Sequence, residues 1–313
     1  MKIINVLILL FTLTPAFPGH SVVSKNSDID LSLEWDTQVS RFLGNESDSR
    51  GPASFCPKTD GGKLILDQEN FRILEFDSNN TYSGYIPLPS STFNYIGQKN
   101  DEYIILLDTL VSQAMYILNF HGEILNEIDL EGRYIPKSGF ITGLLTGDDG
   151  IYVEISHRYS VRILNRNMKD VKRTIVRGRI VSGYSSVICS FSGNSINISR
   201  QPYNSDNHSK TKRIFSANTI NRIIHVQDYT NGTVIIFSEV EFSKSYPYAV
   251  EMQRNTIVFL NRNLEEKARF YSYNMLGLMD QKTEFTVHTD GTVHQMYYGE
   301  TGLEFYSWKR GEI

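Results

Sequence analysis

The stretch GPASFCPKTDGGKLILDQENFRILEFDSNN, residues 51–80, decides the fold. Its segments SFCPK, KLILD and FRILEFD are short and apolar or alternating, as expected of strands, and TDGG, QEN and SNN separate them as turns. Asp-Gly tolerates the positive φ angles of tight hairpins, so TDGG suits a hairpin turn. With TYSGYIPL directly after it, the stretch predicts four antiparallel strands in succession.

The same unit, a polar turn followed by an apolar strand, recurs along the chain. Its turns contain Asp60, Asp101, Asp149, Asn194, Asn231 and Asp290. Successive markers are 41, 48, 45, 37 and 59 residues apart, and several copies carry a second hairpin such as LNFHGEILNEI. A period of roughly 40 to 50 residues with four strands per unit is typical of a β-propeller blade. The alternative is an irregular β-sandwich, but six ordered copies favour an all-β, six-bladed β-propeller.

The first copy resembles an NHL-type repeat, a pattern of the TolB-like six-bladed propellers. The matching positions are Gly51, Pro52, Asp67, Asn70, Arg72, Ile73, Phe76 and Asp77. The second copy keeps Asp108 but has Val111 and Gln113 where the pattern has Asn and Arg. The resemblance implies a six-bladed propeller over roughly residues 37–308 and no particular activity. In such a repeat, we expect Asp67 and Asp108 to fix their turns by hydrogen bonds to backbone N–H groups.

The N-terminal residues have the layout of a signal peptide. Lys2 is followed by an apolar run over residues 3–13 and then by small, turn-prone residues. We expect a signal peptide at residues 1–16, with cleavage after Gly19 as the alternative. An uncleaved anchor is disfavoured because the run is shorter than the roughly 20 residues that a spanning helix needs. The chain is therefore expected to be secreted or periplasmic, with no membrane span after cleavage.

Residues 17–33 read as a polar leader, and residues 34–313 as one propeller domain. The last copy has three strands before the chain ends, which would leave the final blade one strand short. EWDTQVSRFLG alternates in the manner of a strand and precedes the first repeat. We therefore predict that Thr37–Leu43 pairs with Leu303–Trp308 and completes the last blade.

Composition and loop content point to binding rather than to a known chemistry. The net charge of −4 argues against nucleic-acid binding, which needs a basic face. No nucleophile elbow, phosphate-binding loop or dinucleotide fingerprint is present in the sequence. Two loop insertions carry Tyr203, Tyr246 and Tyr248, and exposed tyrosines on a rigid scaffold are typical of binding surfaces. The hypothesis is a monomeric, non-catalytic module that binds a protein or glycan partner.

Histidines supply the alternative hypothesis. His225 and His288 fall in strands expected to be innermost in the fifth and sixth blades, so both could reach the central channel. His294 shares a face with His288 only if the intervening loop has three residues. These three are candidate metal ligands for a lyase or lactonase of the kind found among secreted six-bladed propellers. A metal site needs three or four convergent ligands, and no full set is identifiable, so we expect no cofactor.

The two cysteines, Cys56 and Cys189, are assigned to the innermost strands of the first and fourth blades. These blades are opposite one another in a ring of six. A disulfide requires Cα atoms within roughly 4.4 to 6.8 Å, which strands across a channel do not allow. We therefore predict two free thiols. A disulfide, which export would permit, would require a different blade count or register.

Overall fold

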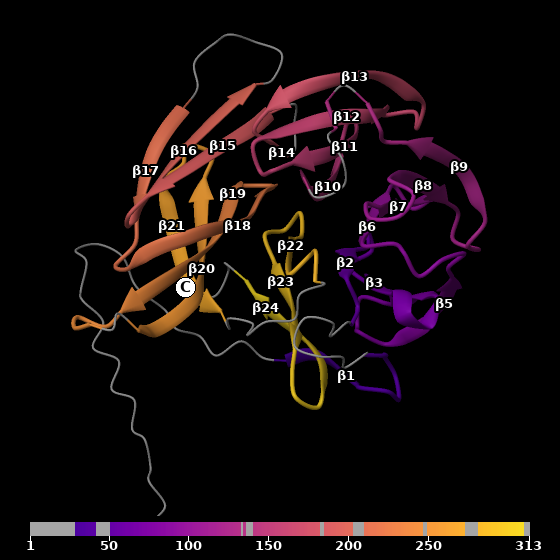
Figure 1. Ribbon diagram of the computed structural model, residues 1–313, viewed down its shortest axis with the longest axis horizontal. Helices are drawn as coiled ribbons and strands as arrows, with labels where there is room; N and C mark the ends of the chain where they lie inside the picture. The colour runs from indigo at the N-terminus through magenta and orange to yellow at the C-terminus, as the bar shows by residue number, and fades with distance from the viewer. Residues whose placement is uncertain are drawn as a thin grey trace, which may run out of the picture.

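The computed structural model describes residues 29–41, 51–132, 134–135, 140–181, 185–202, 210–246, 249–272 and 281–309. In these ranges the chain forms six four-stranded antiparallel sheets and one short 3-10 helix, η1 (Gln68–Asn70). Figure 1 shows the sheets arranged as blades around a common centre. The prediction of an all-β, six-bladed β-propeller is confirmed.

The strands fall into blades in chain order, innermost strand first. Blades 1 to 3 consist of β2 (Ser54–Pro57), β3 (Lys63–Asp67), β4 (Arg72–Phe76) and β5 (Tyr82–Pro87); β6 (Tyr95–Lys99), β7 (Tyr103–Asp108), β8 (Ala114–Leu118) and β9 (Ile124–Asp129); and β10 (Ile141–Gly147), β11 (Gly150–Ile155), β12 (Tyr159–Asn165) and β13 (Asp170–Arg177). Blades 4 to 6 consist of β14 (Arg179–Val181), β15 (Ser185–Ser192), β16 (Ser195–Pro202) and β17 (Lys210–Phe215); β18 (Thr219–Tyr229), β19 (Gly232–Phe242), β20 (Val250–Asn261) and β21 (Glu266–Ser272); and β22 (Phe285–Val287), β23 (Val293–Tyr298), β24 (Gly302–Trp308) and β1 (Ile29–Glu34).

Burial falls from the second strand of a blade to its outermost strand. β3 and β11 are buried at every position because neighbouring blades cover both faces of the sheet. β9, at the outside of blade 2, is exposed at five of its six positions. This gradient explains why KLILD and GIYVEI read as continuous apolar runs rather than as alternating strands.

Asp67 and Asp108, which recur at equivalent positions of the first two repeats, both fix turns but through different partners. The Asp108 carboxylate accepts hydrogen bonds from the backbone N–H groups of Val111 and Ser112, as the sequence predicts. The Asp67 carboxylate instead accepts from the side chains of Asn70 and Arg72, each at 2.8 Å. Both roles are structural, since each carboxylate holds the turn between the second and third strands of its blade.

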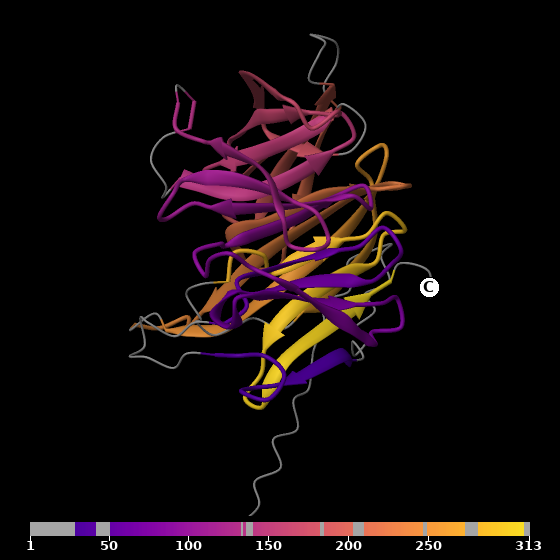
Figure 2. The same ribbon diagram turned by 90° about the vertical axis from the view of Figure 1, so that its right-hand side faces the viewer.

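The strand that completes blade 6 differs from the one predicted. β1 pairs antiparallel with β24, with Leu33 opposite Leu303, and both ribbon views show the indigo β1 beside the yellow β24 (Figures 1 and 2). The predicted segment, Thr37–Leu43, is wrong: Asp36 adopts a φ of 61°, and residues 36–38 form a turn. Residues 42–43 lie outside the described residues, as does the predicted signal peptide at 1–16. Residues 29–33, assigned to the polar leader, belong to β1.

The order of strands and turns in blade 4 also differs from the prediction. Asn194 lies between β15 and β16, so it marks the second turn of the blade and not the first. Cys189 is therefore in the second strand, β15, whereas Cys56 is in an innermost strand, β2, as predicted. Both cysteines are free, as predicted.

The burial of Cys56 and the partial burial of Cys189 should make both thiols poorly reactive in the folded protein. Burial raises the pKa of Cys56 and of Cys189 to about 12. Because the thiolate is the reactive form, we expect a thiol reagent to modify the native protein on the order of 100-fold more slowly than the unfolded protein. Two thiols per chain should react after unfolding without reductant, and a Cys56→Ser variant should retain one. Zero thiols in the unreduced, unfolded monomer would contradict the free-thiol assignment.

Hydrophobic clusters join most neighbouring blades. Five clusters of buried residues connect blades 1 and 2, 2 and 3, 4 and 5, 5 and 6, and 6 and 1. Among the described residues, blades 3 and 4 share no such cluster. Their junction contains buried polar groups instead, and these groups reach the central channel.

Candidate functional site

A cavity of about 920 Å³ occupies the centre of the ring. It is lined by residues from the innermost strands of all six blades, β2, β6, β10, β14, β18 and β22. Neighbouring innermost strands end side by side: Lys99 Nζ donates to Gly147 O, and the Thr230 N–H donates to Thr289 O. The innermost strands therefore run in the same direction along the channel.

The direction of these strands distinguishes two ends of the cavity. We call the strands of each blade A to D from inside to outside. The AB mouth is the end at which A–B turns lie, such as Asp148–Asp149 and Thr230–Asn231. The BC mouth is the opposite end, with B–C turns such as residues 156–158 and the connections from each D strand to the next A strand.

The two mouths differ in charge. Among the described residues, the charged side chains that line the cavity near the BC mouth are Arg179, Arg222, Lys282 and Glu284. Those near the AB mouth are Lys58, Asp148 and Asp228. The BC mouth thus has an excess of cationic side chains, and the AB mouth has an excess of carboxylates.

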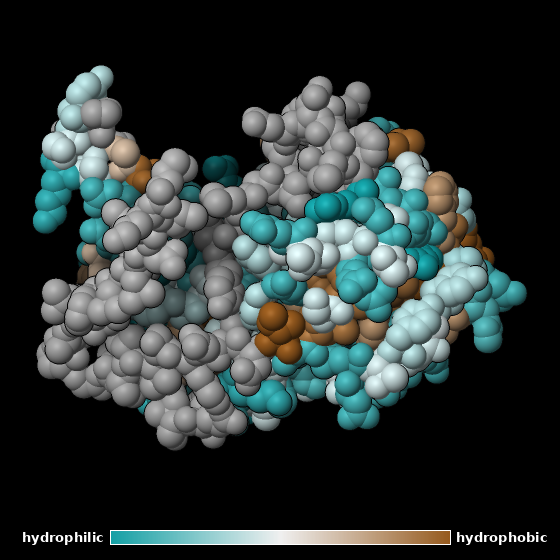
Figure 3. Space-filling model, turned by 90° about the horizontal axis from the view of Figure 1, so that it is seen from below, coloured by the Kyte–Doolittle hydropathy of each residue, from teal (hydrophilic) through white to brown (hydrophobic). Residues whose placement is uncertain are grey.

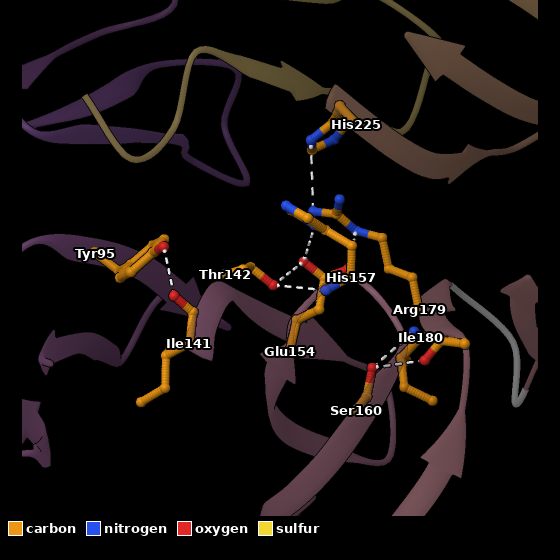
Figure 4. A network of polar contacts seen from close by, with 10 residues as sticks. Tyr95, Ile141, Thr142, Glu154, His157, Ser160, Arg179, Ile180 and His225 are labelled. Atoms are coloured by element: carbon orange, nitrogen blue, oxygen red, sulfur yellow. Dashed lines mark hydrogen bonds and ion pairs between the residues drawn. The ribbon is translucent and has the colours of Figure 1, made fainter. Parts of the chain in front are cut away.

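A buried carboxylate, Glu154 of β11, organises the BC end of the blade 3–4 junction (Figure 4). Its Oε2 accepts from Thr142 Oγ1 at 3.1 Å and lies 2.9 Å from His157 Nδ1. Its Oε1 lies 3.7 Å from Arg179 Nε, beyond hydrogen-bond distance. Burial raises the pKa of Glu154, but Arg179, His157 and Thr142 together outweigh burial and leave that pKa below its usual value. Glu154 is therefore an anion at neutral pH, although its side chain is only 1% exposed.

His157 is held against Glu154 by an unusual turn. Ser156 and His157 both adopt positive φ angles, 51° and 54°, and the Arg158 N–H closes the turn on Ile155 O. Two-residue hairpin turns of this type favour Asn and Gly, because other residues are strained there. The His157 N–H donates to Thr142 Oγ1 at 3.0 Å, which adds a second attachment. The positive φ angles of Ser156 and His157 strain the backbone, and the turn fixes the His157 imidazole at the rim of the cavity.

His225 lies on the other side of Arg179, in β18 of blade 5 (Figure 4). Its Nε2 is 2.9 Å from Gln227 Oε1, and Gln227 Nε2 donates to Val287 O at 2.8 Å. Since the Gln227 amide is oriented by Val287, its oxygen faces the imidazole, and His225 must donate from Nε2. His225 Nδ1 is then an acceptor that faces Arg179 Nη2 at 3.5 Å. Burial and the Arg179 charge lower the pKa of His225 to about 3, so the ring is neutral.

Glu284 is the second buried carboxyl group at the BC mouth. Its Oε1 accepts from Asn255 Nδ2 at 2.9 Å and from Gln295 Nε2 at 3.0 Å. Its nearest cation, Arg222, is 3.9 Å away and its side chain is 61% exposed. Burial raises the pKa of Glu284 to about 7 despite these partners. The group therefore titrates near neutral pH, and it is only partly charged in the folded protein.

The predicted histidine set does not form a metal site. The loop between β22 and β23 has three residues between His288 and Thr292, so His288 and His294 share a face. His294 Nδ1, however, lies 3.6 Å from Asp30 Oδ2 of β1, at the seam between blades 6 and 1. His225 is occupied by Gln227 and faces a guanidinium, which disfavours a cation. Among the described residues no three His, Cys, Asp or Glu side chains are grouped so as to hold a metal ion.

The predicted tyrosines are only partly described. Tyr246, between β19 and β20, is 87% exposed. Its neighbours Phe242 and Val250, which pair across the hairpin, are also exposed. Tyr203 and Tyr248 lie outside the described residues. The strand ends beside Tyr246 are at the BC side of blade 5, whereas Pro202 and Lys210 end their strands at the AB side of blade 4.

The outer surface of the ring shows no separation of hydrophobic from hydrophilic side chains in the coloured part of Figure 3. Seen from the side of the ring, hydrophobic and hydrophilic side chains are interspersed over the coloured part of the surface (Figure 3). Single exposed hydrophobic residues are common on the surfaces of globular domains. No helix of the described chain has the length and apolar character required to cross a membrane.

Comparisons with known proteins support the fold. No model of a known protein family matches the chain. No curated protein sequence matches it. A solved structure of a member of the DUF4221 family from Bacteroides vulgatus is similar, with a TM-score of 0.55 and 15% identity over 92% of this chain and 98% of that one.

Two further structures align less well. They are virginiamycin B lyase from Staphylococcus aureus (TM-score 0.45, 11% identity, 88% of this chain and 98% of that one) and BamB from Moraxella catarrhalis (0.41, 8%, 90% and 99%). At these identities the DUF4221 structure shows the fold alone, and the other two carry no functional argument. The chain is thus a six-bladed β-propeller with a polar central cavity, and the finer NHL-type assignment is not confirmed.

Proposed function

We propose that this chain is an exported, non-catalytic binding module that takes a protein or glycan partner at the BC mouth of its channel. The observation that carries the proposal is the cavity of about 920 Å³, to which all six innermost strands contribute side chains. A site assembled from six rigid strands is preorganised, which reduces the entropy lost on binding. Export to the periplasm or the cell exterior, and action as a monomer, are part of the same proposal.

The lining of the BC mouth suits a polar partner. Its uncharged polar side chains are Thr142, Asn221, Gln253, Gln281 and Thr283. Hydroxyl and amide groups both donate and accept hydrogen bonds, so they can match a partner rich in hydroxyl or amide groups. Gln281 Oε1 is buried without a hydrogen-bond partner, so it is an acceptor that a ligand could satisfy.

Blade 5 adds a wall at the same mouth. Its β18, β19 and β20 are 11, 11 and 12 residues long, whereas β2 and β3 of blade 1 have 4 and 5 residues. The wall ends in the hairpin with exposed Tyr246. Tyr246 is not among the residues that line the cavity, but it lies at the same BC side of the ring. An exposed aromatic side chain there supports binding of either a sugar ring or a protein surface.

Metal-dependent lyase or lactonase chemistry has no comparable support. The residues that would supply ligands are dispersed, with His225 bonded to Gln227 and His294 beside Asp30. These separate contacts do not bring the histidines together as ligands of one metal ion.

A substitution that narrows the BC mouth tests the proposed site. Asn221→Trp places a large side chain in the BC mouth, and Thr59→Trp is the matched change at the AB mouth. We expect Asn221→Trp to weaken binding of glycans or proteins identified by array screening at least about tenfold, because the side chain occupies space that the ligand needs. Thr59→Trp should leave the affinity unchanged, with circular dichroism confirming the fold of both variants. Equal binding by Asn221→Trp and the unmodified protein would place the binding site elsewhere.

A further inference from the structure

Arg179 is the best-placed charge at the BC mouth for contacting a ligand. It begins the short strand β14, lines the cavity, and its side chain is largely buried. A buried guanidinium has five N–H donors and requires acceptors for them. Within the described part of the chain, its side-chain contacts are His225 Nδ1 at 3.5 Å and Glu154 Oε1 at 3.7 Å. Both contacts are too long to be strong hydrogen bonds.

The neighbouring groups hold Arg179 in place without using its donors fully. Glu154 directs Oε2 to Thr142 and His157, so its better hydrogen bonds go to those residues. His225 is a neutral acceptor because its Nε2 hydrogen is committed to Gln227. The neutral imidazole of His225 does not repel the Arg179 guanidinium. Its single contact of 3.5 Å leaves the other N–H donors of Arg179 without an acceptor on this ring.

The surroundings favour an anion at this point. Arg222 and Lys282 line the same mouth, and Arg222 is only loosely associated with Glu284 at 3.9 Å. His157 lines the cavity as well, with its Nδ1 directed to Glu154. Its Nε2 is the remaining ring nitrogen and is available to a ligand, since the side chain is 52% exposed.

We infer that the BC mouth binds an acidic glycan, whose anionic group is held by Arg179 with support from Arg222. The inference deepens the proposed function and rests on it. A guanidinium pairs with a carboxylate or sulfate through two parallel N–H···O bonds, which a single ammonium group cannot do. The hydroxyl and amide side chains around the mouth then pair with sugar hydroxyls. The accessible surface of the cavity is more polar than apolar, which favours a sugar over a peptide that binds through apolar side chains.

Isothermal titration calorimetry with defined oligosaccharides tests the inference. The probes are an oligogalacturonide, its neutral methyl ester, a sulfated heparin-derived oligosaccharide and an oligoglutamate peptide. The unmodified protein should bind at least one acidic sugar more tightly than the neutral ester. Binding should weaken as sodium chloride rises from about 0.05 to 0.5 M, because partly exposed charges are screened. The carboxylated and sulfated probes identify which anionic group fits.

Two arginine variants locate the anionic group. Arg179→Gln should lower affinity for the acidic sugar about 10- to 100-fold, the range expected for a lost charge-assisted hydrogen bond. Arg222→Gln, at an exposed side chain that folding does not depend on, should lower it less, to about 3- to 10-fold. Lys58→Gln, at the AB mouth, is the matched charge control and should leave the affinity unchanged.

The outcomes separate this inference from the proposed function. Equal binding of the neutral ester and the acidic sugar, with sensitivity to Asn221→Trp but not to either arginine variant, overturns the acidic-glycan inference and leaves the BC mouth as the binding site. Preferential binding of oligoglutamate overturns the choice of a glycan. Failure of every acidic probe to bind at millimolar concentration overturns the inference outright.

Discussion

A chain that begins at Trp35 is expected to melt on the order of 10 °C below a chain that begins at Asp28. The shorter chain lacks β1, whose pairing with β24 completes blade 6. Loss of β1 removes the Leu33 side chain from a cluster that includes Leu303 and Phe305, and such losses cost about 2 to 5 kcal/mol per large side chain. It also leaves β24 as an open sheet edge with unpaired backbone groups. Differential scanning calorimetry of the two chains measures the effect.

Polar contacts at the same seam add to the loss. Ser307 Oγ donates to Asp30 Oδ1 at 3.0 Å, and Asn80 Nδ2 donates to Asp30 O at 3.1 Å. Asp30 therefore attaches β1 both to its own blade and to blade 1.

Point variants separate burial from chain length. Leu33→Ala removes a side chain that is 2% exposed, whereas Ile29→Ala truncates one that is 52% exposed on the same strand. We expect Leu33→Ala to destabilise the protein by about 2 to 5 kcal/mol and Ile29→Ala by less than about 0.5 kcal/mol. Equal melting of the two truncated chains would mean that β1 does not stabilise the ring.

The regular spacing of turns along the chain was enough to predict a six-bladed ring, but not to place every strand within its blade. The six markers fall at turns in the structure, yet Asn194 marks the second turn of blade 4. The innermost strand there, β14, has only three residues, too few for a periodic signal. β1 was missed for a related reason: IDLSLE is short and polar on one face, whereas EWDTQVSRFLG alternates for longer, although a turn at Asp36 interrupts it.

The residues of the candidate site were harder to predict from the sequence than the ring of blades. Glu154, Arg179 and His225 belong to different blades, and their proximity depends on how three blades pack. His157 lies in a turn, and its contact with the buried Glu154 depends on the fold rather than on any local sequence pattern. One usable signal was present: GIYVEI contains a carboxylate within an otherwise apolar strand, and a buried charge usually has partners.

Acid should destabilise the protein through His225. Burial and Arg179 hold the pKa of the folded imidazole at about 3, whereas an unfolded histidine has a pKa of 6.5. Between these values the unfolded chain binds a proton that the folded chain does not, so the free energy of unfolding falls as pH is lowered. At pH 4 this group alone is expected to cost about 3 kcal/mol relative to pH 7.5. His294 acts in the same direction, because burial also lowers its pKa.

The His225 contribution can be measured by difference. His225→Gln keeps an acceptor for Arg179 and a donor for Gln227 but does not titrate. Urea unfolding at a series of pH values should show the variant losing about 3 kcal/mol less than the unmodified protein between pH 7.5 and pH 4. Parallel pH profiles for the two proteins would mean that His225 accepts a proton in the folded state near its ordinary pKa.

Between about pH 4.5 and 7, the titration of Glu284 changes the free energy of unfolding in the opposite direction to that of His225. Its folded pKa of about 7 lies above the ordinary value of 4.5, so the folded chain binds the extra proton and the free energy of unfolding rises as pH falls from 7 to 4.5. The loss of stability should therefore be shallow above pH 4.5 and steep below it. Glu284→Gln, whose Oε1 can still accept from Asn255 and Gln295, removes the opposing effect. We expect this variant to be more stable by about 3 kcal/mol at pH 8 and to begin losing stability near pH 6.5. A variant with the same onset of acid unfolding as the unmodified protein would show that Glu284 is ionised normally in the folded chain.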